Sequence, residues 1–237
     1  MTLPSLPQNA ALLLDMDGTL IDIARTPDSV VVPLDLPPVL RRLRARLGDA
    51  LAIVTGRPID QVDQLLAGIP YAVAGEHGGA IRHAPDDAVV RVSLAEPPPE
   101  WLEEAERLAR ETPGVLLERK QRSFVLHHRL APVAGPALRE AMERMLAGHG
   151  EDFAIMGALM AWEMKPLGAD KGTAVTALMA QPPFAGRMPI YIGDDVTDED
   201  GMRAARALGG AGWRVQDVFT DAAGVRAWLA SEAARTA

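Results

Sequence analysis

The chain has 237 residues with a formal net charge of −8, and 48% of them are hydrophobic. This length fits one large α/β domain or a core with a smaller inserted domain. The lack of cysteine excludes disulfides, thiolate zinc sites and cysteine nucleophiles. An acidic charge without a basic stripe argues against nucleic-acid and anionic-membrane partners. Because neither a secretory leader nor an apolar run of membrane-spanning length is visible, we expect a cytoplasmic protein.

The first third of the chain alternates between predicted strands and helices. Buried strands are expected over residues 10–14, 50–54 and 71–74, because each is a short apolar run that ends in turn residues. Helices are expected between them, over residues 36–47 and 59–66. This alternation of strand and helix indicates a parallel, doubly wound sheet.

The pattern changes over residues 83–162 and then returns. The middle segment combines strand-like pieces at 89–92, 115–119, 123–128 and 153–156 with helical patterns at 100–110 and 136–147. Beyond it, helices are expected at 171–179, 197–208 and 222–229, with strands at 188–192 and 213–215. We therefore predict an α/β fold in which residues 1–82 and 163–237 form a doubly wound, parallel-sheet (Rossmann-like) core, and residues 83–162 form an inserted α+β cap domain.

Two carboxylates directly follow the first predicted strand. Residues 15–20 read D-M-D-G-T-L, which places Asp15 and Asp17 at the carboxyl end of that strand, where open α/β sheets bind ligands. Two acids at the edge of a core are costly unless a cation lies between them, most simply a hard divalent cation with oxygen ligands. For D-x-D-G alone, the alternative is an ordinary turn after a strand.

Further polar residues fall at the ends of other core elements. Thr55 follows the second strand, Lys171 begins a predicted helix, and Asp194, Asp195 and Asp198 follow a late strand. Acidic oxygen ligands, a hydroxyl and a lysine are what phosphoryl transfer needs, because its catalysis consists mostly of positioning and charge stabilisation. Taken singly, the threonine could be a helix cap, the lysine a surface residue and the acidic segment a solvated turn.

Lysine is rare in this chain. Only three of its 24 basic residues are lysine, at positions 120, 165 and 171. A chain that otherwise uses arginine is expected to keep lysine where a compact, flexible charge matters. The alternative is that three lysines remain after a compositional drift toward arginine.

Taken in order, these motifs resemble the haloacid dehalogenase superfamily of phosphatases. The resemblance implies that Asp15 is the nucleophile and forms an aspartyl-phosphate. It implies that Asp17 is first the general acid and then the general base, and that Thr55 and Lys171 hold the phosphoryl oxygens.

The same resemblance implies a magnesium site. Mg²⁺ would be held by the Asp15 carboxylate, the Asp17 backbone carbonyl and Asp194. Asp195 and Asp198 are expected to support this site, and Asp198 is the stronger candidate for that role.

The inserted segment narrows the resemblance to trehalose-6-phosphate phosphatases. The segments that carry it read T-G-R-P at 55–58, G-E-H-G at 75–78, E-R-K at 118–120, H-H-R at 127–129 and E-M-K-P at 163–166. This resemblance implies that Glu118, Lys120 and Glu163 contact the sugar hydroxyls. Arg57 is either a further substrate contact or an ion-pair partner beside a helix. His77 is expected to position a loop or a domain interface and not to bind a metal.

Two positions depart from the pattern of that family, and both bear on the sugar preference. Gly79 and Ala80 stand where a glutamate is often found, and His128 replaces a common tyrosine. The expected function is Mg²⁺-dependent hydrolysis of trehalose 6-phosphate by a monomer. The alternatives are a capped phosphatase for sucrose phosphate, a glycosyl-phosphoglycerate or a hexose phosphate, a phosphotransferase or mutase, and a non-catalytic regulator that binds a sugar phosphate.

Overall fold

The computed structural model describes residues 3–24, 26, 29–93, 95–120 and 122–235. The chain divides into two compact units, of which the first combines Met1–Val92 with Asp170–Ala237 and the second is Ser93–Ala169. Within the described residues, no helix is both long enough and apolar enough to cross a membrane.

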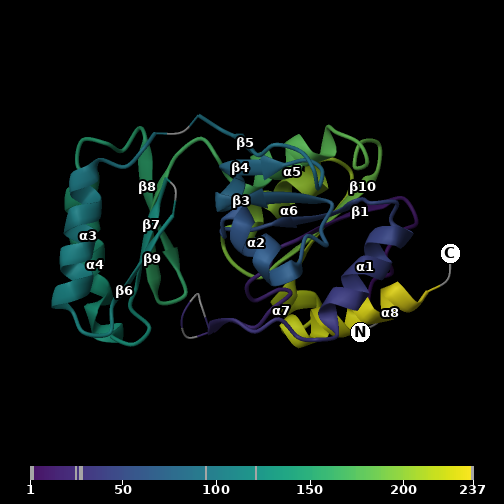
Figure 1. Cartoon of the computed structure of the whole chain (residues 1–237), viewed down its shortest axis with the longest axis horizontal. Helices are drawn as coiled ribbons and strands as arrows, with labels where there is room; N and C mark the ends of the chain where they lie inside the picture. The colour runs from purple at the N-terminus through teal and green to yellow at the C-terminus, as the bar shows by residue number, and fades with distance from the viewer. Residues whose placement is uncertain (1–2, 25, 27–28, 94, 121, 236–237) are drawn as a thin grey trace. The chain divides into compact units, whose positions relative to one another are not determined.

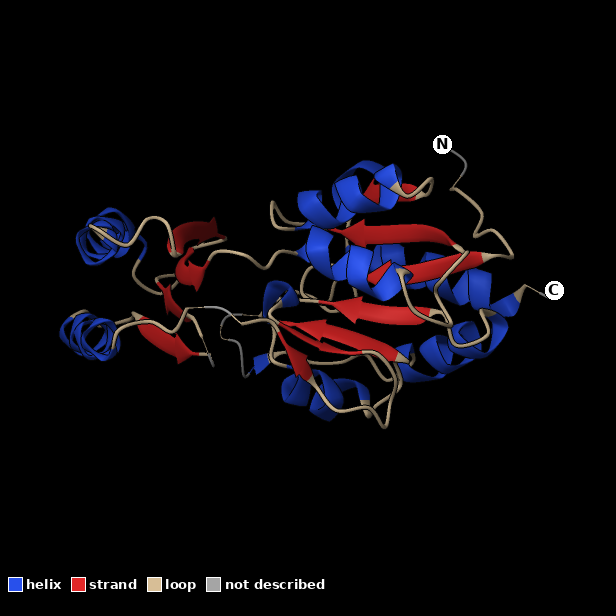
Figure 2. Cartoon of the chain, turned by 90° about the horizontal axis from the view of Figure 1, so that it is seen from above, coloured by secondary structure: helices blue, strands red, loops and turns tan. Residues whose placement is uncertain are grey.

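The first unit is built on a seven-stranded sheet with the order β11-β10-β1-β2-β3-β4-β5 (Figure 1). Its parallel strands are β1 (Ala10–Leu14), β2 (Leu51–Val54), β3 (Ala72–Gly75), β10 (Met188–Gly193) and β11 (Ala211–Arg214), and β4 (Ala80–Arg82) and β5 (Val90–Arg91) run antiparallel at one edge. Every residue of β1, β2 and β3 is buried. Helices cover both faces of this sheet (Figure 2), which explains why these strands are continuous apolar runs.

The helices of the first unit are α1 (Leu36–Arg46), α2 (Ile59–Leu66), α5 (Lys171–Met179), α6 (Asp198–Ala207), α7 (Val215–Val218) and α8 (Ala222–Ala234), with a short 3₁₀ helix η2 (Glu76–Gly78). Helix α1 packs on α8, and α5 packs on α6. The start of α5 is fixed by a capping box, in which the Asp170 carboxylate accepts the Thr173 amide at 2.7 Å. This cap makes Lys171 the first residue of the helix.

The strand order changes direction between β1 and β10. The chain passes from β1 to β2 and β3 on one side, and it later returns to place β10 and β11 on the other. Leu14 pairs with Ile192, so β1 and β10 end side by side. A ligand site is expected at this switch point, beyond the carboxyl ends of the two strands.

The second unit is a four-stranded antiparallel sheet with the order β6-β7-β9-β8. Its elements are α3 (Pro99–Glu111), β6 (Leu116–Arg119), β7 (Phe124–His127), a 3₁₀ turn η3 (Pro132–Ala134), α4 (Gly135–Leu146), β8 (Phe153–Ala158) and β9 (Ala161–Pro166). Both helices lie on the same face of the sheet (Figure 1), where Trp101 of α3 and Leu138 of α4 join the apolar side chains of β7, β8 and β9. The opposite face carries the polar residues described below.

The predicted α/β core with an α+β insertion is confirmed, but the expected elements are incomplete. Strand β9 was not expected, because Glu163 and Lys165 interrupt its apolar pattern even though both are buried. The two units also divide later in the chain than the expected boundaries at 82/83 and 162/163. The reason is pairing: β5 pairs with β4 of the first unit, and all of β9 pairs within the second.

Candidate active site

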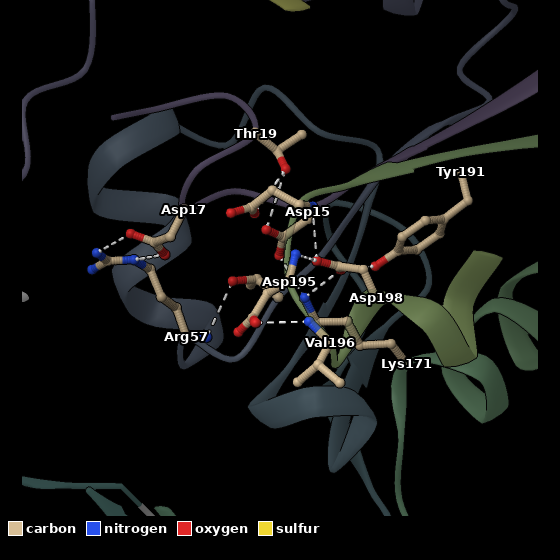
Figure 3. A network of polar contacts seen from close by, with 11 residues as sticks. Asp15, Asp17, Thr19, Arg57, Lys171, Tyr191, Asp195, Val196 and Asp198 are labelled. Carbon is tan, nitrogen blue, oxygen red and sulfur yellow. Dashed lines mark hydrogen bonds and ion pairs between the residues drawn. The ribbon is translucent and has the colours of Figure 1, made fainter. Parts of the chain in front are cut away.

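Three charged side chains meet at the carboxyl ends of β1 and β10. The Lys171 ammonium lies 2.7 Å from Asp15 Oδ1 and 2.6 Å from Asp198 Oδ1 (Figure 3). The three residues come from the end of β1 and the starts of α5 and α6, and they are only 4%, 3% and 0% exposed. The structure thus brings the predicted nucleophile and the predicted phosphate-binding lysine into direct contact.

This cluster holds more carboxylates than ammonium groups, since the single Lys171 lies between Asp15 and Asp198. Burial raises the pKa of Asp15 well above its usual value, and the charge of Asp198 raises it further, while Lys171 only partly opposes this. Burial alone would lower the pKa of Lys171, but Asp15 and Asp198 together raise it, so the ammonium stays protonated. Burial and the carboxylates of Asp198 and Asp195 raise the pKa of Asp194 to about 6. An additional cation would therefore be stabilised here.

The donor atoms fit a magnesium ion. Carboxylate oxygens of Asp15, Asp194 and Asp198 lie within 4.8 Å of one another. Thr19 Oγ1 lies 3.3 Å from Asp194 Oδ1 and 3.5 Å from Asp15 Oδ2. Oxygen donors of this kind are preferred by Mg²⁺, and a bound cation would relieve the repulsion that raises the two aspartate pKa values.

Gly18 provides the room for this arrangement, which leads to a first prediction. Its φ is +81°, and a Cβ atom at this position would lie 2.2 Å from Asp194 Oδ2. We expect Gly18→Ala to displace the Asp194 carboxylate and to weaken Mg²⁺ binding and kcat by at least about tenfold. Isothermal titration with Mg²⁺ and steady-state kinetics measure the two effects.

Gly68→Ala is the matched control for this change. Gly68 also has a left-handed φ, +65°, but a Cβ atom there has no neighbour within 4 Å. Both variants should lose stability from backbone strain, on the order of 1 kcal/mol. Only Gly18→Ala should lose Mg²⁺ affinity, and equal Mg²⁺ affinity in the two variants would contradict the role given to Gly18.

Asp17 is held by a different cation. Arg57 Nε and Nη2 donate to the two oxygens of Asp17, each at 2.6 Å (Figure 3). Arg57 also contacts Gln61 of α2 through Nη1, at 3.3 Å. The structure therefore shows Arg57 in an ion pair with Asp17, and its contact with a substrate stays a prediction. The side chain of Asp17 is separate from the Asp15–Asp194–Asp198 cluster.

The turn after β2 packs against η2. The Thr55 hydroxyl oxygen accepts the Arg57 amide at 3.2 Å, and the Thr55 carbonyl accepts the His77 amide at 3.0 Å. A Cβ atom on Gly56 would lie 2.6 Å from His77 Nε2, so the imidazole lies against this turn. Thr55 is 1% exposed, and its O–H can still donate to a ligand because only its oxygen is used by Arg57.

Asp195 has a local role in the structure. Its Oδ1 accepts the Val196 amide at 2.7 Å, which stabilises the turn between β10 and α6. Its own amide donates to Asp198 Oδ2 at 3.0 Å.

The three predicted sugar contacts share one face of the antiparallel sheet in the second unit. Glu118 and Glu163 both pair with Val125, one from each side, so the three side chains point the same way. Lys120 Nζ lies 3.0 Å from Glu163 Oε1, and the Ser123 hydroxyl donates to the same oxygen at 2.8 Å. We call this face the polar face; its members are Glu118, Lys120, Ser123, His127, Glu163 and Lys165.

Glu118 is oriented by a histidine on the polar face. Its Oε2 lies 2.7 Å from His127 Nε2. Burial would raise the pKa of Glu118, but the hydrogen bond to His127 and the charge of Lys120 lower it overall. Glu118 is therefore a carboxylate at neutral pH, and a carboxylate accepts hydrogen bonds from hydroxyl groups.

The residues that depart from the family pattern at positions 80 and 128 are both buried. His128 is buried beside Trp162, with the ring centroids 6.4 Å apart, and a Cβ atom on Gly135 of α4 would lie 2.7 Å from its ring. Ala80 is buried in β4 and pairs with Gly75 and Arg91. Both residues therefore serve packing in this chain.

Two residues of the core cluster were missed from the sequence. Thr19 lies within the D-x-D-G-T motif and could have been named from it. Tyr191 lies in the middle of an apolar strand, and its hydroxyl donates to Asp198 Oδ1 at 2.6 Å. No signal in the sequence separates this tyrosine from an ordinary core aromatic residue.

Comparisons with known proteins agree with this geometry. Residues 13–227 match the family model for trehalose-phosphatase. A "probable trehalose-phosphate phosphatase" of Sinorhizobium fredii is 44% identical over 207 residues, which cover 87% of this chain and 78% of that protein. The trehalose-6-phosphate phosphatase of Escherichia coli is 32% identical over 228 residues, which cover 92% of this chain and 82% of that protein.

Solved structures show the same fold. The C-terminal domain of C. albicans trehalose-6-phosphate phosphatase superposes with a TM-score of 0.78 at 20% identity, covering 99% of each chain. The sucrose-phosphatase of Synechocystis superposes with a TM-score of 0.56 at 17% identity, covering 90% of this chain and 84% of the other. The fold is thus shared by phosphatases for different sugar phosphates, whereas the family model and the sequence relatives are specific: this chain belongs to the trehalose-phosphatase family.

Proposed function

We propose that the protein hydrolyses trehalose 6-phosphate to trehalose and phosphate through an aspartyl-phosphate on Asp15. The observation that carries this proposal is the contact of Asp15 with Lys171 at the switch point of the sheet, with a second carboxylate, Asp17, two residues away. A merely binding protein has no need for that second carboxylate. Membership in the trehalose-phosphatase family supports the choice of substrate.

In the first half of the reaction, an Asp15 oxygen attacks phosphorus. The bond between phosphorus and the sugar oxygen breaks, and protonated Asp17 gives its proton to that oxygen. The products of this step are free trehalose and a phosphate ester of Asp15. Lys171 and the Thr55 hydroxyl donate to the phosphoryl oxygens and stabilise their charge.

In the second half, Asp17 acts as a base. It takes a proton from a water molecule whose oxygen attacks phosphorus, and the bond between phosphorus and Asp15 breaks. Free phosphate leaves, Asp15 regains its carboxylate, and Asp17 regains its proton. Arg57 donates to both oxygens of Asp17 and so orients the carboxylate that exchanges protons with the substrate.

The proposed magnesium site uses the Asp15 carboxylate, the Asp17 backbone carbonyl and the Asp194 carboxylate. A magnesium ion bound there supplies charge neutralisation for the phosphoryl group. The protein residues keep these oxygens close together: Gly18 leaves room for the Asp194 carboxylate, and Lys171 balances part of the charge on Asp15.

We propose that the inserted unit determines which sugar phosphate is used, through the polar face. Sugar hydroxyls are both donors and acceptors of hydrogen bonds. Glu118 and Glu163 can accept from them, and Lys120 can donate to them. Two of the three lysines in the chain, Lys120 and Lys165, lie on the polar face, and the third is Lys171.

Phosphate release with Mg²⁺ tests the proposal on a panel of substrates. The panel holds trehalose 6-phosphate, sucrose phosphate, a glycosyl-phosphoglycerate and glucose 6-phosphate. We expect the highest kcat/KM for trehalose 6-phosphate and loss of turnover in EDTA. A higher kcat/KM for another sugar phosphate would reassign the substrate. Binding of trehalose 6-phosphate without phosphate release would instead indicate a regulator.

Lys120→Ala tests the role of the polar face. The variant loses the cation beside Glu163 and a donor for the sugar. We expect kcat/KM for trehalose 6-phosphate to fall by about 10- to 100-fold, and kcat/KM for p-nitrophenyl phosphate to change by less than about threefold, because the small ester has no sugar to recognise.

Arg119→Ala is the matched control for Lys120→Ala. Arg119 is the preceding residue, and its side chain is exposed and pairs with Glu106 of α3, on the opposite face of the sheet. Arg119→Ala should leave kcat/KM unchanged for both substrates. If Lys120→Ala lowers kcat/KM equally for both substrates, Lys120 does not recognise the sugar.

A further inference from the structure

The Tyr191 hydroxyl lies directly behind the proposed catalytic cluster, on the far side of Asp198. We propose that Tyr191 is a positioning residue: by fixing the Asp198 carboxylate, it holds both Lys171 and the Asp194 backbone in their working places. This inference rests on the proposed function, because it concerns the efficiency of that reaction.

The first observation is that the Asp198 carboxylate is saturated with donors. Its Oδ1 accepts the Lys171 ammonium and the Tyr191 hydroxyl, each at 2.6 Å. Its Oδ2 accepts the amides of Asp194 and Asp195, at 3.1 and 3.0 Å. A carboxylate has about four acceptor positions, so these four donors use all of them. Asp198 lies beside the proposed magnesium ligands, but its oxygens already accept hydrogen bonds from protein donors.

The second observation concerns the other roles of the residues that donate to Asp198. Lys171 also contacts Asp15, the proposed nucleophile. The Asp194 amide belongs to the residue whose carboxylate is a proposed magnesium ligand. The buried Asp198 carboxylate therefore sets the position of the Lys171 ammonium and that of the backbone that carries the Asp194 ligand. Any rotation of the Asp198 carboxylate would move both.

The Tyr191 hydroxyl is the donor that resists this rotation. An ionised carboxylate can only accept, so the phenol is the donor in this hydrogen bond. Lys171 approaches Oδ1 from α5, whereas Tyr191 approaches it from β10 (Figure 3). Without the hydroxyl, Oδ1 keeps only the flexible lysine, and the carboxylate is held less firmly.

The Tyr191 ring is tightly packed. Its residue is 0% exposed and pairs with Leu13 of β1 and Gly212 of β11. A Cβ atom on Gly201 of α6 would lie 2.6 Å from the ring, and a Cβ atom on Gly193 would lie 2.2 Å from the Asp198 carboxylate carbon. The ring and the carboxylate thus pack directly against the backbone of these glycines. This packing holds the Tyr191 hydroxyl at a fixed distance from the Asp198 carboxylate.

Tyr191→Phe tests this role, with Tyr71→Phe as the matched control. The chain has two tyrosines, and Tyr71 lies at the other end of the sheet's strands, where its ring meets Phe184 and Arg44. In Tyr191→Phe we expect kcat for trehalose 6-phosphate to fall about tenfold with KM within about twofold, and the Kd for Mg²⁺ alone to rise about tenfold. Tyr71→Phe should match the wild type in all three.

A double-mutant cycle separates positioning through Asp198 from a general packing defect. On an Asp198→Asn background, Tyr191→Phe should change the Kd for Mg²⁺ by less than about twofold, because the carboxylate through which it acts is gone. Thermal unfolding of each variant confirms that it is folded at the temperature of the titration.

Two results would overturn the inference: a wild-type kcat and Mg²⁺ affinity in Tyr191→Phe, or the same tenfold loss of affinity on the Asp198→Asn background. A wild-type protein that binds Mg²⁺ but releases no phosphate would contradict the proposed function. The Mg²⁺ titrations of the cycle would still decide the role of Tyr191.

Discussion

Asp15→Asn is expected to lower kcat by at least about 10⁴-fold while the protein remains folded, because an amide cannot attack phosphorus although it has nearly the shape of the acid. The stability of the variant has a predictable sign. Burial and the charge of Asp198 raise the pKa of Asp15, so folding destabilises its ionised form relative to the unfolded chain. A neutral amide removes the repulsion from Asp194 and Asp198, and we expect the free energy of unfolding without Mg²⁺ to be maintained or to rise.

Phosphate release and thermal unfolding of Asp15→Asn measure both effects. Asp22→Asn is the matched control, because it makes the same exchange seven residues later in an aspartate that is 71% exposed and paired with Arg226. That variant should keep wild-type turnover. Phosphate release by Asp15→Asn at more than about 1% of the wild-type rate would show that Asp15 is not the nucleophile.

Lys171→Arg is expected to be strongly damaging, although it keeps the positive charge. The ammonium is 3% exposed and lies within 2.7 Å of two carboxylates, so the space is shaped for a compact group. A planar guanidinium is larger and presents its donors in a fixed fork. We expect kcat to fall by about 10²- to 10³-fold, and the free energy of unfolding to fall by about 1–3 kcal/mol from overpacking.

Steady-state kinetics with trehalose 6-phosphate and chemical denaturation measure these losses. A kcat within about threefold of the wild type would mean that charge alone is enough at this position, and the rarity of lysine in the chain would then have no catalytic meaning. Lys171→Met completes the comparison. It removes the charge and leaves Asp15 and Asp198 facing each other, so it should be less active than Lys171→Arg.

The core and the polar residues at the ends of its strands were predictable because local sequence determines them. A parallel strand covered on both faces is a continuous apolar run, and the residues that follow it reach the same edge of the sheet as those that follow its neighbours. Asp15, Thr55 and Asp194 are therefore predictable from the sequence as residues at one edge of the sheet. Lys171 was predictable because Asp170 and Thr173 form the capping box that begins its helix.

The remaining features depend on contacts between distant parts of the chain. The pair of Asp17 and Arg57 joins residues 40 positions apart, and either residue could have faced the substrate instead. Strand β9 alternates charged and apolar residues, and both charges are buried with a partner: Glu163 contacts Lys120, and Lys165 donates to the Ala169 carbonyl. Tyr191 looks like a core residue in the sequence, and only the position of Asp198 reveals its second contact.

The contact between Lys171 and Asp15 spans 156 positions of the chain, which has a consequence for protein synthesis. Strand β1 leaves the ribosome early, but its neighbour β10 and the lysine that contacts Asp15, the residue after β1, are made only in the final third of translation. Domains generally fold as units while they are being made, and the inserted unit is complete before the core that surrounds it in sequence. A nascent chain released before Lys171 therefore carries the proposed nucleophile without its cation, and we expect such fragments to be catalytically inert.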